Sequence, residues 1–153
     1  MSEPSILDRI QTDMVAAMKA RDADKLSTLR MLKTALMEAK TKKPKDSTLS
    51  EDEAIEVLQR YAKKRRETIE EFEKLGHSEL VPKEQAEIAV TQHYLPQAID
   101  EAELRAIVIA AVASTGASLP REMGKVISAV MPQVKGRADG SVVSRLVKEA
   151  LGG

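Results

Sequence analysis

Apolar residues recur with helical spacing along most of the chain. From about Ser5 to Arg21 they return every three or four positions, and a second series of this kind runs from about Lys25 to Lys40. Asp24 is a suitable N-cap for the second segment. The short polar break R-D-A-D between the two segments predicts an antiparallel helical hairpin. The main apolar positions of this hairpin are Ile6, Ile10, Met14, Met18, Leu26, Leu29, Leu32 and Leu36.

A polar loop, T-K-K-P-K-D-S-T-L, separates this hairpin from a longer helix. The run S-E-D-E, from Ser50 to Glu53, has the form of a capping box that begins the helix, and Gly76 is suited to end it. Pro82 fits the first turn of a further helix that reaches about Tyr94. The buried face of the long helix is expected to contain Ala54, Leu58, Tyr61, Ile69 and Phe72.

The motif Y-L-P-Q, from Tyr94 to Gln97, indicates a domain boundary, because proline disfavours helical geometry at the residue before it. Three shorter helical patterns follow, each with its own cap: Glu101 to about Ser114 after Asp100, about Pro120 to Met131 after Ser118, and Gly140 to Leu151 after Asp139. No stretch shows sustained period-two alternation. The sequence therefore predicts an all-α fold, with an N-terminal helical domain of long antiparallel helices (1–95) and a C-terminal three-helix module (96–153).

Composition narrows the classes of function. The chain has no cysteine, which excludes disulfides and thiolate chemistry. No apolar run approaches the roughly 20 residues of a membrane span, and the N-terminus lacks the apolar segment of a secretory signal, so a cytoplasmic protein without membrane contact is expected. Lys and Arg equal Asp and Glu at 24 each, which argues against a globally basic nucleic-acid binder and leaves room for a local patch.

The three aromatic residues, Tyr61, Phe72 and Tyr94, are too few for a surface that stacks single-stranded bases. An RNA complex of this chain is therefore expected to rest on backbone and shape. Catalysis and metal binding have no candidate residues. The histidines His77 and His93 lack a helical partner of ligand type and are expected to be solvated or hydrogen-bonded, and no known metal or phosphate-loop motif occurs. No catalytic residue, metal or cofactor is predicted.

Arg65, in the run K-K-R-R, interrupts an otherwise apolar stripe. At about 100° per residue it lies within about 20° of Ala54 around the long helix. Its expected role is to snorkel or to pair with a carboxylate of a neighbouring helix, and an anionic ligand is the alternative. Acid pairs such as Glu84 with Glu87 are typical of solvated helix faces or of salt-bridge partners.

The segment from Leu119 to Gly153 has more cations than acids. Helical phasing places its cations on the polar faces of the last two helices. Around K-G-R-A-D-G, Gly136 can adopt positive φ and Asp139 can cap the last helix, whose N-terminus beside two cations could seat a phosphate. A capped tight turn with solvated cations is the alternative. The cations are Arg121, Lys125, Lys135, Arg137, Arg145 and Lys148, and the acids are Glu122, Asp139 and Glu149.

Gly124, in M-G-K-V, is expected inside a helix, where it costs about 1 kcal/mol relative to alanine. Close approach of another helix would account for it.

Several motifs together resemble the YqeY family, which is related to the C-terminal tail of the B subunit of glutamyl-tRNA(Gln)/aspartyl-tRNA(Asn) amidotransferase. They are L-R-M-L-K, K-K-R-R-E-T-I-E-E-F, Y-L-P, R-E-M-G-K-V-I and K-G-R-A-D-G-S-V-V-S-R-L-V, and the resemblance covers nearly the whole chain. It implies an all-helical fold in two parts. In the amidotransferase the related tail contacts the tRNA elbow. Carried over, the matching positions are Met123, Gly124, Lys125, Gly136, Arg137, Asp139 and Gly140.

The resemblance thus implies a tRNA-associated accessory protein. The six C-terminal cations are the residues expected to contact phosphate. Aminoacyl-tRNA synthetases or amidotransferase subunits are the expected protein partners, and DNA is not expected. The alternative is a protein–protein adaptor for such a complex, without RNA contact of its own. The family is associated with carbon–nitrogen ligase activity with glutamine as amido donor. Because the kinase-like catalytic part of the amidotransferase has no counterpart here, this chain alone is not expected to catalyse that reaction.

Overall fold

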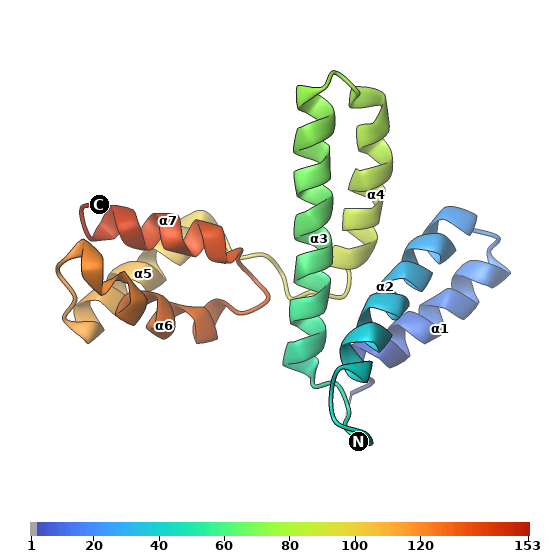
Figure 1. Ribbon diagram of the computed structural model, residues 1–153, viewed down its shortest axis with the longest axis horizontal. Coiled ribbons are helices and arrows are strands. Elements are labelled where there is room, and N and C mark those ends of the chain that lie inside the picture. Colours follow the sequence, from blue (N-terminus) through green and yellow to red (C-terminus); the bar gives the residue numbers. More distant parts are fainter. Residues whose placement is uncertain (1–2) are drawn as a thin grey trace. The chain divides into compact units, whose positions relative to one another are not determined.

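The computed structural model describes residues 3–153, and these form seven α-helices, two short 3-10 helices and no strand (Figure 1). The predicted all-α class is confirmed. The chain divides between Leu95 and Pro96 into two compact units. The unit before this point contains two helical hairpins, and the unit after it contains three shorter helices.

The first hairpin consists of α1 (Ile6–Lys19) and α2 (Ala23–Thr41), which run antiparallel as predicted (Figure 1). The prediction that Asp24 caps α2 is wrong. Arg21 adopts a left-handed conformation with φ 58°, so the chain turns within few residues and α2 begins at Ala23. The Asp22 carboxylate is therefore the cap, and it accepts a hydrogen bond from the Lys25 amide at 3.2 Å.

The second hairpin consists of α3 (Glu51–Lys74) and α4 (Val81–Gln92), joined through a 3-10 helix, Ser78–Leu80. The predicted capping box is present, with reciprocal hydrogen bonds between Ser50 and Glu53. Gly76 follows the end of α3 with φ 76°, where a side chain would be strained. These local signals set both ends of α3.

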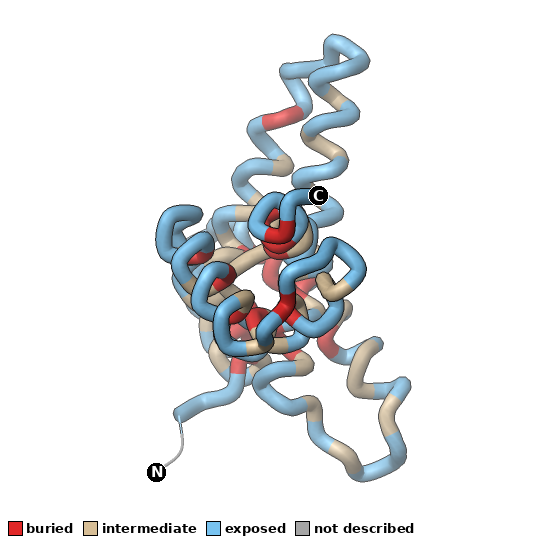
Figure 2. Tube along the Cα trace, turned by 90° about the vertical axis from the view of Figure 1, so that its left-hand side faces the viewer, coloured by how far each residue is buried: buried red, intermediate tan, exposed pale blue. Residues whose placement is uncertain are grey.

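The core of this unit lies where α1, α2 and the first half of α3 meet. Toward the far end of α3, Ile69 and Phe72 are only half-buried, and Figure 2 shows the end of the α3–α4 hairpin mostly exposed. Met18 was expected in the buried stripe, but its side chain is 57% exposed because it lies near the end of the α1–α2 hairpin that extends away from α3. The buried residues are Ile6, Ile10, Ala17, Leu26, Leu29, Leu32, Leu36, Ala54, Ile55, Leu58 and Tyr94.

Tyr94, from the Y-L-P motif, belongs to this core although it follows α4. Its hydroxyl donates a hydrogen bond to the Asp13 carboxylate on α1, and the Arg9 guanidinium lies 5.3 Å from its ring centroid. Burial, reinforced by the Asp13 carboxylate, raises the pKa of the Tyr94 phenol. The motif therefore fastens the last residues of this unit to its first helix.

The second unit packs α5 (Glu101–Thr115), α6 (Met123–Val134) and α7 (Gly140–Ala150) around a core rich in valine. Asp100 and Asp139 cap α5 and α7 as predicted. The buried residues are Leu104, Val108, Ala111, Ala117, Val126, Val130, Val134, Val143, Leu146, Val147 and Leu151.

Two predictions at the start of α6 are wrong. Ser118 does not cap the helix. Instead the Glu122 carboxylate accepts the backbone amides of Ser118 and Leu119, at 3.4 and 3.3 Å, and a 3-10 helix, Pro120–Glu122, precedes α6. Gly124 consequently lies in the first turn of α6. A Cβ there would meet no atom of residues 3–153 within 4 Å, so close approach of another helix does not account for this glycine.

Within residues 3–153, no single helix has the length and hydropathy of a membrane span, and α5 with Pro120–Val134 reaches both only as a pair bent by 98°.

Candidate nucleic-acid interface

The turn between α6 and α7 carries the motif K-G-R-A-D-G. Gly136 has φ 81°, and the Arg137 amide donates back to the Val134 carbonyl at 2.8 Å. The Asp139 carboxylate accepts the Ser141 amide at 2.9 Å and so begins α7. The predicted roles of Gly136 and Asp139 in the turn are confirmed. A β-carbon at Gly136 would be strained because L-residues rarely adopt this backbone conformation.

Arg137 fastens this turn to the segment that leads into α5. Its Nε donates to the Gln97 carbonyl at 3.0 Å, and its own carbonyl accepts the Ile99 amide at 2.9 Å. A terminal nitrogen of the same guanidinium lies 3.9 Å from the Glu103 carboxylate. Arg137 thus has a structural role within the unit, whereas its contact with phosphate stays a prediction.

Arg145 lies in a cluster of four alternating charges on α5 and α7. It donates to the Glu101 carboxylate of α5 and lies 3.3 Å from Glu149 on its own helix, while Arg105 contacts Glu149 at 3.2 Å. The hydrogen bond from Arg145 lowers the pKa of Glu101, and the same bond raises the pKa of Arg145. Both side chains remain about half exposed, at 49% and 50%, so the cluster is accessible to solvent.

Lys125 forms a looser pair. Its ammonium lies 3.6 Å from the Glu122 carboxylate, the same group that accepts two amides before α6. Arg121, Lys135 and Lys148 are exposed, and in residues 3–153 neither Arg121 nor Lys148 has an ion pair. The structure therefore separates the predicted cations: Arg137 and Arg145 contact carboxylates of α5, whereas Arg121, Lys125 and Lys148 extend toward solvent, and Lys135 is exposed in the turn.

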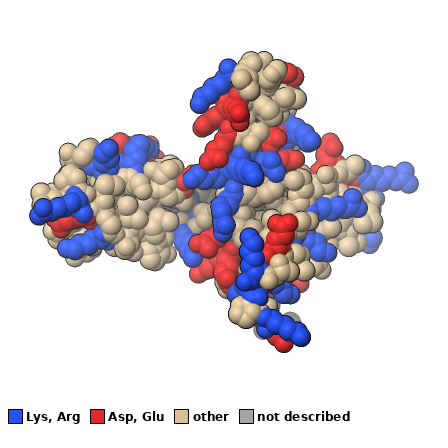
Figure 3. Space-filling view, viewed as in Figure 1, with Lys and Arg blue, Asp and Glu red and all other residues tan. Residues whose placement is uncertain are grey.

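The tertiary structure also changes the charge balance that the last 35 residues suggest. Folding brings Glu101 and Glu103, from the first turn of α5, onto the cations of the turn and of α7. Across residues 96–153, seven Lys and Arg residues stand against six Asp and Glu residues. On the face drawn in Figure 3, the cations of this unit lie in separate groups around an uncharged surface. On this face the unit has scattered cations rather than a continuous basic patch.

Sequence reasoning missed these carboxylate partners for a definable reason. The spacings Glu101–Arg105 and Arg145–Glu149 are visible as i, i+4 pairs within single helices. The contact between Arg145 and Glu101 joins positions 44 apart in the chain. Only the packing of α7 against α5 brings them together.

A second charged site lies between α3 and α4. The Arg65 Nε is 3.4 Å from the Glu87 carboxylate and 3.8 Å from that of Glu84, and its guanidinium carbon lies 4.6 Å from the Tyr61 ring centroid. The prediction that Arg65 pairs with a carboxylate of a neighbouring helix is confirmed. The anionic-ligand alternative loses its motivation, because two carboxylates already face the guanidinium.

This site is more deeply buried than the α5–α7 cluster. The Arg65, Glu84 and Glu87 side chains are 20%, 13% and 12% exposed. Within the described residues, the Arg65 Nε and one Glu84 oxygen are buried without a hydrogen-bond partner. Burial, and then the charge of Glu84, raise the pKa of Glu87, and burial raises the pKa of Tyr61. The arrangement thus places one buried cation between two carboxylates of α4.

Metal-binding geometry is absent from the part of the chain that the structure describes: no three of its His, Asp and Glu residues are grouped so that they could hold an ion. His77 lies 3.4 Å from Glu79 at the hairpin turn, and His93 is exposed beside Tyr94.

Comparison with known proteins matches residues 7–151 to the family described as Yqey-like protein. A relative named "Altered inheritance of mitochondria protein 41, mitochondrial", from Pyrenophora tritici-repentis, is 32% identical over 98% of this chain and 83% of its own length. An uncharacterized protein of Schizosaccharomyces pombe is 30% identical over 61% of this chain and 75% of its own length. The match to the family spans both units.

Proposed function

We propose that this chain, which belongs to the YqeY-like family, is a tRNA-associated accessory protein whose C-terminal unit binds RNA by shape and phosphate contacts. One observation carries the proposal: the residues that match the amidotransferase tail motif lie together in a compact three-helix unit with its own apolar core. Such a unit can present its polar rim to a rigid RNA without refolding. The related tail of the amidotransferase contacts the tRNA elbow.

The side chains that would contact phosphate are not equivalent. Arg121, Lys125 and Lys148 extend from exposed helix faces. Arg145 would have to leave the Glu101 carboxylate before it could bind a phosphate. The proposal therefore assigns the larger share of the electrostatic affinity to the exposed cations, with contacts to the backbone rather than to bases.

A salt series with the full chain and total tRNA tests the proposal. On duplex DNA, each phosphate contact contributes about −0.9 to the slope of log affinity against log salt concentration. If that scale holds for tRNA, six contacts would give a slope of about −5. If Arg137 and Arg145 stay with their carboxylates, the slope is about −4 or shallower.

Charge reversal supplies the matched control. Lys125→Glu should weaken tRNA binding and flatten the salt slope. Lys74→Glu makes the same charge change at the far end of α3 and should leave binding nearly unchanged. Absence of tRNA binding at low salt contradicts the proposal, and so does an equal loss in both variants.

Amide formation by this chain alone is not part of the proposal. Incubating the pure protein with misacylated tRNA, ATP and glutamine measures that reaction directly. Formation of amidated product would show that the chain is an enzyme and would contradict the proposal of an accessory protein.

A protein–protein adaptor is the second candidate function. The observation that favours it is that four large apolar side chains of the first hairpin are exposed: Val15, Met18, Met31 and Met37. Solvent-exposed apolar clusters are typical of interaction sites. An affinity pull-down of a synthetase or amidotransferase subunit that survives nuclease treatment would favour this candidate over RNA binding.

A further inference from the structure

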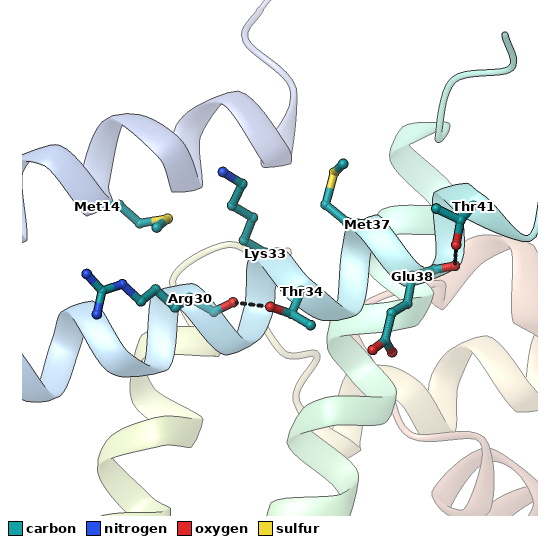
Figure 4. A pocket seen from close by; sticks show the side chains of 7 residues that line it. All are labelled: Met14, Arg30, Lys33, Thr34, Met37, Glu38 and Thr41. Atoms are coloured by element: carbon teal, nitrogen blue, oxygen red, sulfur yellow. Dashed lines mark hydrogen bonds between the residues drawn. The ribbon is translucent and has the colours of Figure 1, made fainter.

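A shallow groove of about 520 Å³ runs along the α1–α2 hairpin. Figure 4 shows Met14 on α1 across from Arg30 and Lys33 on α2, with Met37 further along the same helix. Thr34 and Thr41 donate their hydroxyls to carbonyls one turn earlier, at 2.9 and 2.7 Å, and so turn little polarity toward the groove. The walls are therefore mainly methionine side chains and the aliphatic stems of the two cations.

The apolar surface of the groove itself is open to solvent. Of the two methionines that line it, Met37 is 38% exposed and Met14 is half-buried. Val15, Met18 and Met31 are also exposed on these two helices, outside the lining of the groove. Single exposed apolar residues are normal on protein surfaces, but apolar side chains gathered in a groove indicate a contact site. Methionine is unbranched and adaptable, which suits a surface that accepts the side chains of a partner.

The charge and the length of the groove restrict the kind of partner that it can bind. Arg30 and Lys33 have no ion pair within residues 3–153, and Glu38 is the single acid that lines the groove. An occupant with carboxylates at its edge would pair with both cations. The α2 wall extends from Arg30 to Thr41, which at 1.5 Å per residue is about 17 Å, or roughly three helical turns.

We infer that this groove binds an acidic amphipathic helix of a protein partner. The helix lies between α1 and α2, places apolar side chains against Met14 and Met37, and directs carboxylates to Arg30 and Lys33. A nucleic acid would leave the methionines uncovered, and the groove offers no aromatic ring for base stacking. The inference does not depend on tRNA binding, because it uses no residue of the C-terminal unit.

Three synthetic 18-residue peptides test the inference against the full chain. The first is an amphipathic helix with leucine on one face and glutamate beside it. The second has the same composition in scrambled order, and the third replaces every glutamate with lysine. Calorimetry should show binding of the first peptide alone. In spectra of methyl-labelled methionine, this peptide should shift the Met14 and Met37 signals and leave those of Met123 and Met131 in place.

Charge reversal then tests the assigned contacts. Arg30→Glu combined with Lys33→Glu should weaken the acidic peptide about tenfold and allow the lysine peptide to bind. The matched control, Arg60→Glu with Lys64→Glu, makes the same charge change on the exposed face of α3 and should keep the original affinity. Circular dichroism melting checks that both variants remain folded.

Four outcomes overturn the inference: no binding of the acidic peptide, equal binding of all three peptides, an equal loss in the control variant, or shifts confined to Met123 and Met131. A concentration-dependent dimer that shifts the Met37 methyl signal would assign the groove to a second copy and also overturn it. Adding total tRNA in place of the peptide should leave the Met14 and Met37 signals unmoved. The two proposals can therefore fail separately: absence of peptide binding contradicts this inference, and absence of tRNA binding contradicts the tRNA proposal.

Discussion

The α3–α4 hairpin and the C-terminal unit both place an arginine between two helices, but at different depths. Arg65 and its carboxylate partners are at most one-fifth exposed, whereas Arg145 and Glu101 are about half exposed. Burying an ion pair carries a desolvation cost that only good partners offset, while an exposed pair costs and contributes little. The Arg65 site is therefore part of the packing between α3 and α4, whereas the paired Arg145 side chain stays accessible to solvent.

The two regions also differ in what fills the space between helices. The C-terminal unit packs valine and leucine from all three helices, and its charges lie at the rim. Beyond its first half, α3 meets α4 mainly through half-buried side chains and the Arg65 site, and Val81 is the buried apolar residue at the start of α4. The first arrangement depends on apolar volume and the second on one cation, so each should fail through a different substitution.

The largest expected effect comes from the apolar core. Leu146→Ala removes a leucine side chain that is fully buried in the C-terminal unit and should cost about 2–5 kcal/mol of unfolding free energy. Because the chain forms two compact units with separate cores, amides of the C-terminal unit should lose hydrogen-exchange protection while those of α2 keep theirs. Equal loss of protection in both units would contradict this separation.

Removing the buried cation should have the next largest effect. Arg65→Ala leaves Glu84 and Glu87 facing each other without a counter-charge, and it should cost about 3 kcal/mol in urea unfolding. The neighbouring exposed residue gives the control, since Arg66→Ala should change stability by less than about 0.5 kcal/mol. Combining Arg65→Leu with Glu84→Gln and Glu87→Gln should recover most of the loss. A small effect of Arg65→Ala would show that the site does not stabilise the hairpin.

Glu87→Gln should produce a smaller, pH-dependent gain. Burial raises the pKa of Glu87 above its usual value of 4.5. The Glu87 carboxylate therefore binds a proton more readily in the folded state than in the unfolded state. The stability contributed by Glu87 is thus fully present below pH 4.5 and is lost as pH rises through the folded pKa. Compared with the natural chain, Glu87→Gln should be more stable at pH 7 and indistinguishable below pH 4.5. A gain that does not vary with pH would exclude the titration of Glu87 as its cause.

At Glu53, at the start of α3, the pH dependence of stability has the opposite sign. The Lys43 ammonium, which donates to Glu53 at 2.6 Å, and the Ser50 amide lower its pKa to about 2. Its contribution is present above pH 4.5 and is lost as pH falls toward 2. Glu53→Gln should therefore lower the melting temperature at pH 7 and have a diminishing effect toward pH 2. An effect of equal size at both pH values would identify packing rather than charge as the cause.

The smallest stability change is expected in the α5–α7 cluster. Glu101→Gln removes an exposed carboxylate and should barely change the melting temperature, because exposed ion pairs contribute little. If the C-terminal unit binds tRNA, the same substitution frees Arg145 and should raise tRNA affinity most at low salt. Unchanged affinity at every salt concentration would show that Arg145 does not reach the RNA.

The sequence was informative wherever a structural feature depends on a few neighbouring residues. The Ser50 capping box, the Asp100 and Asp139 caps and the positive φ of Gly136 all follow from side chains or backbone within four positions. The errors concern where α2 and α6 begin. Asp22 caps α2 in place of Asp24 because Arg21 reverses the chain. Ser118 does not cap α6 because the 3-10 helix Pro120–Glu122 comes first, and the Glu122 carboxylate accepts the Ser118 and Leu119 amides.

Features that depend on contacts between residues far apart in the chain were harder to predict from the sequence. Helical phasing placed Arg65 among apolar positions and so indicated a carboxylate partner, but it could not choose Glu84 and Glu87 among the many acids of the chain. Phasing likewise placed Arg145 on a polar face and gave no sign that Glu101 would reach it. Tyr94 appeared as part of a boundary motif, whereas its contact with Asp13 joins positions 81 apart.

By itself, the sequence determined the helical class, the positions of most helix ends and the membership of the family, because capping, periodicity and motif order are written in short stretches of chain. Only the tertiary structure decided which cations are neutralised, which methionines lie open beside a groove and how deep each ion pair is buried. The physical reason is that charge compensation and burial depend on the distance between side chains in space. The turn K-G-R-A-D-G shows both: its shape follows from Gly136 and Asp139, and the carboxylate that lies near its arginine, that of Glu103, comes from another helix.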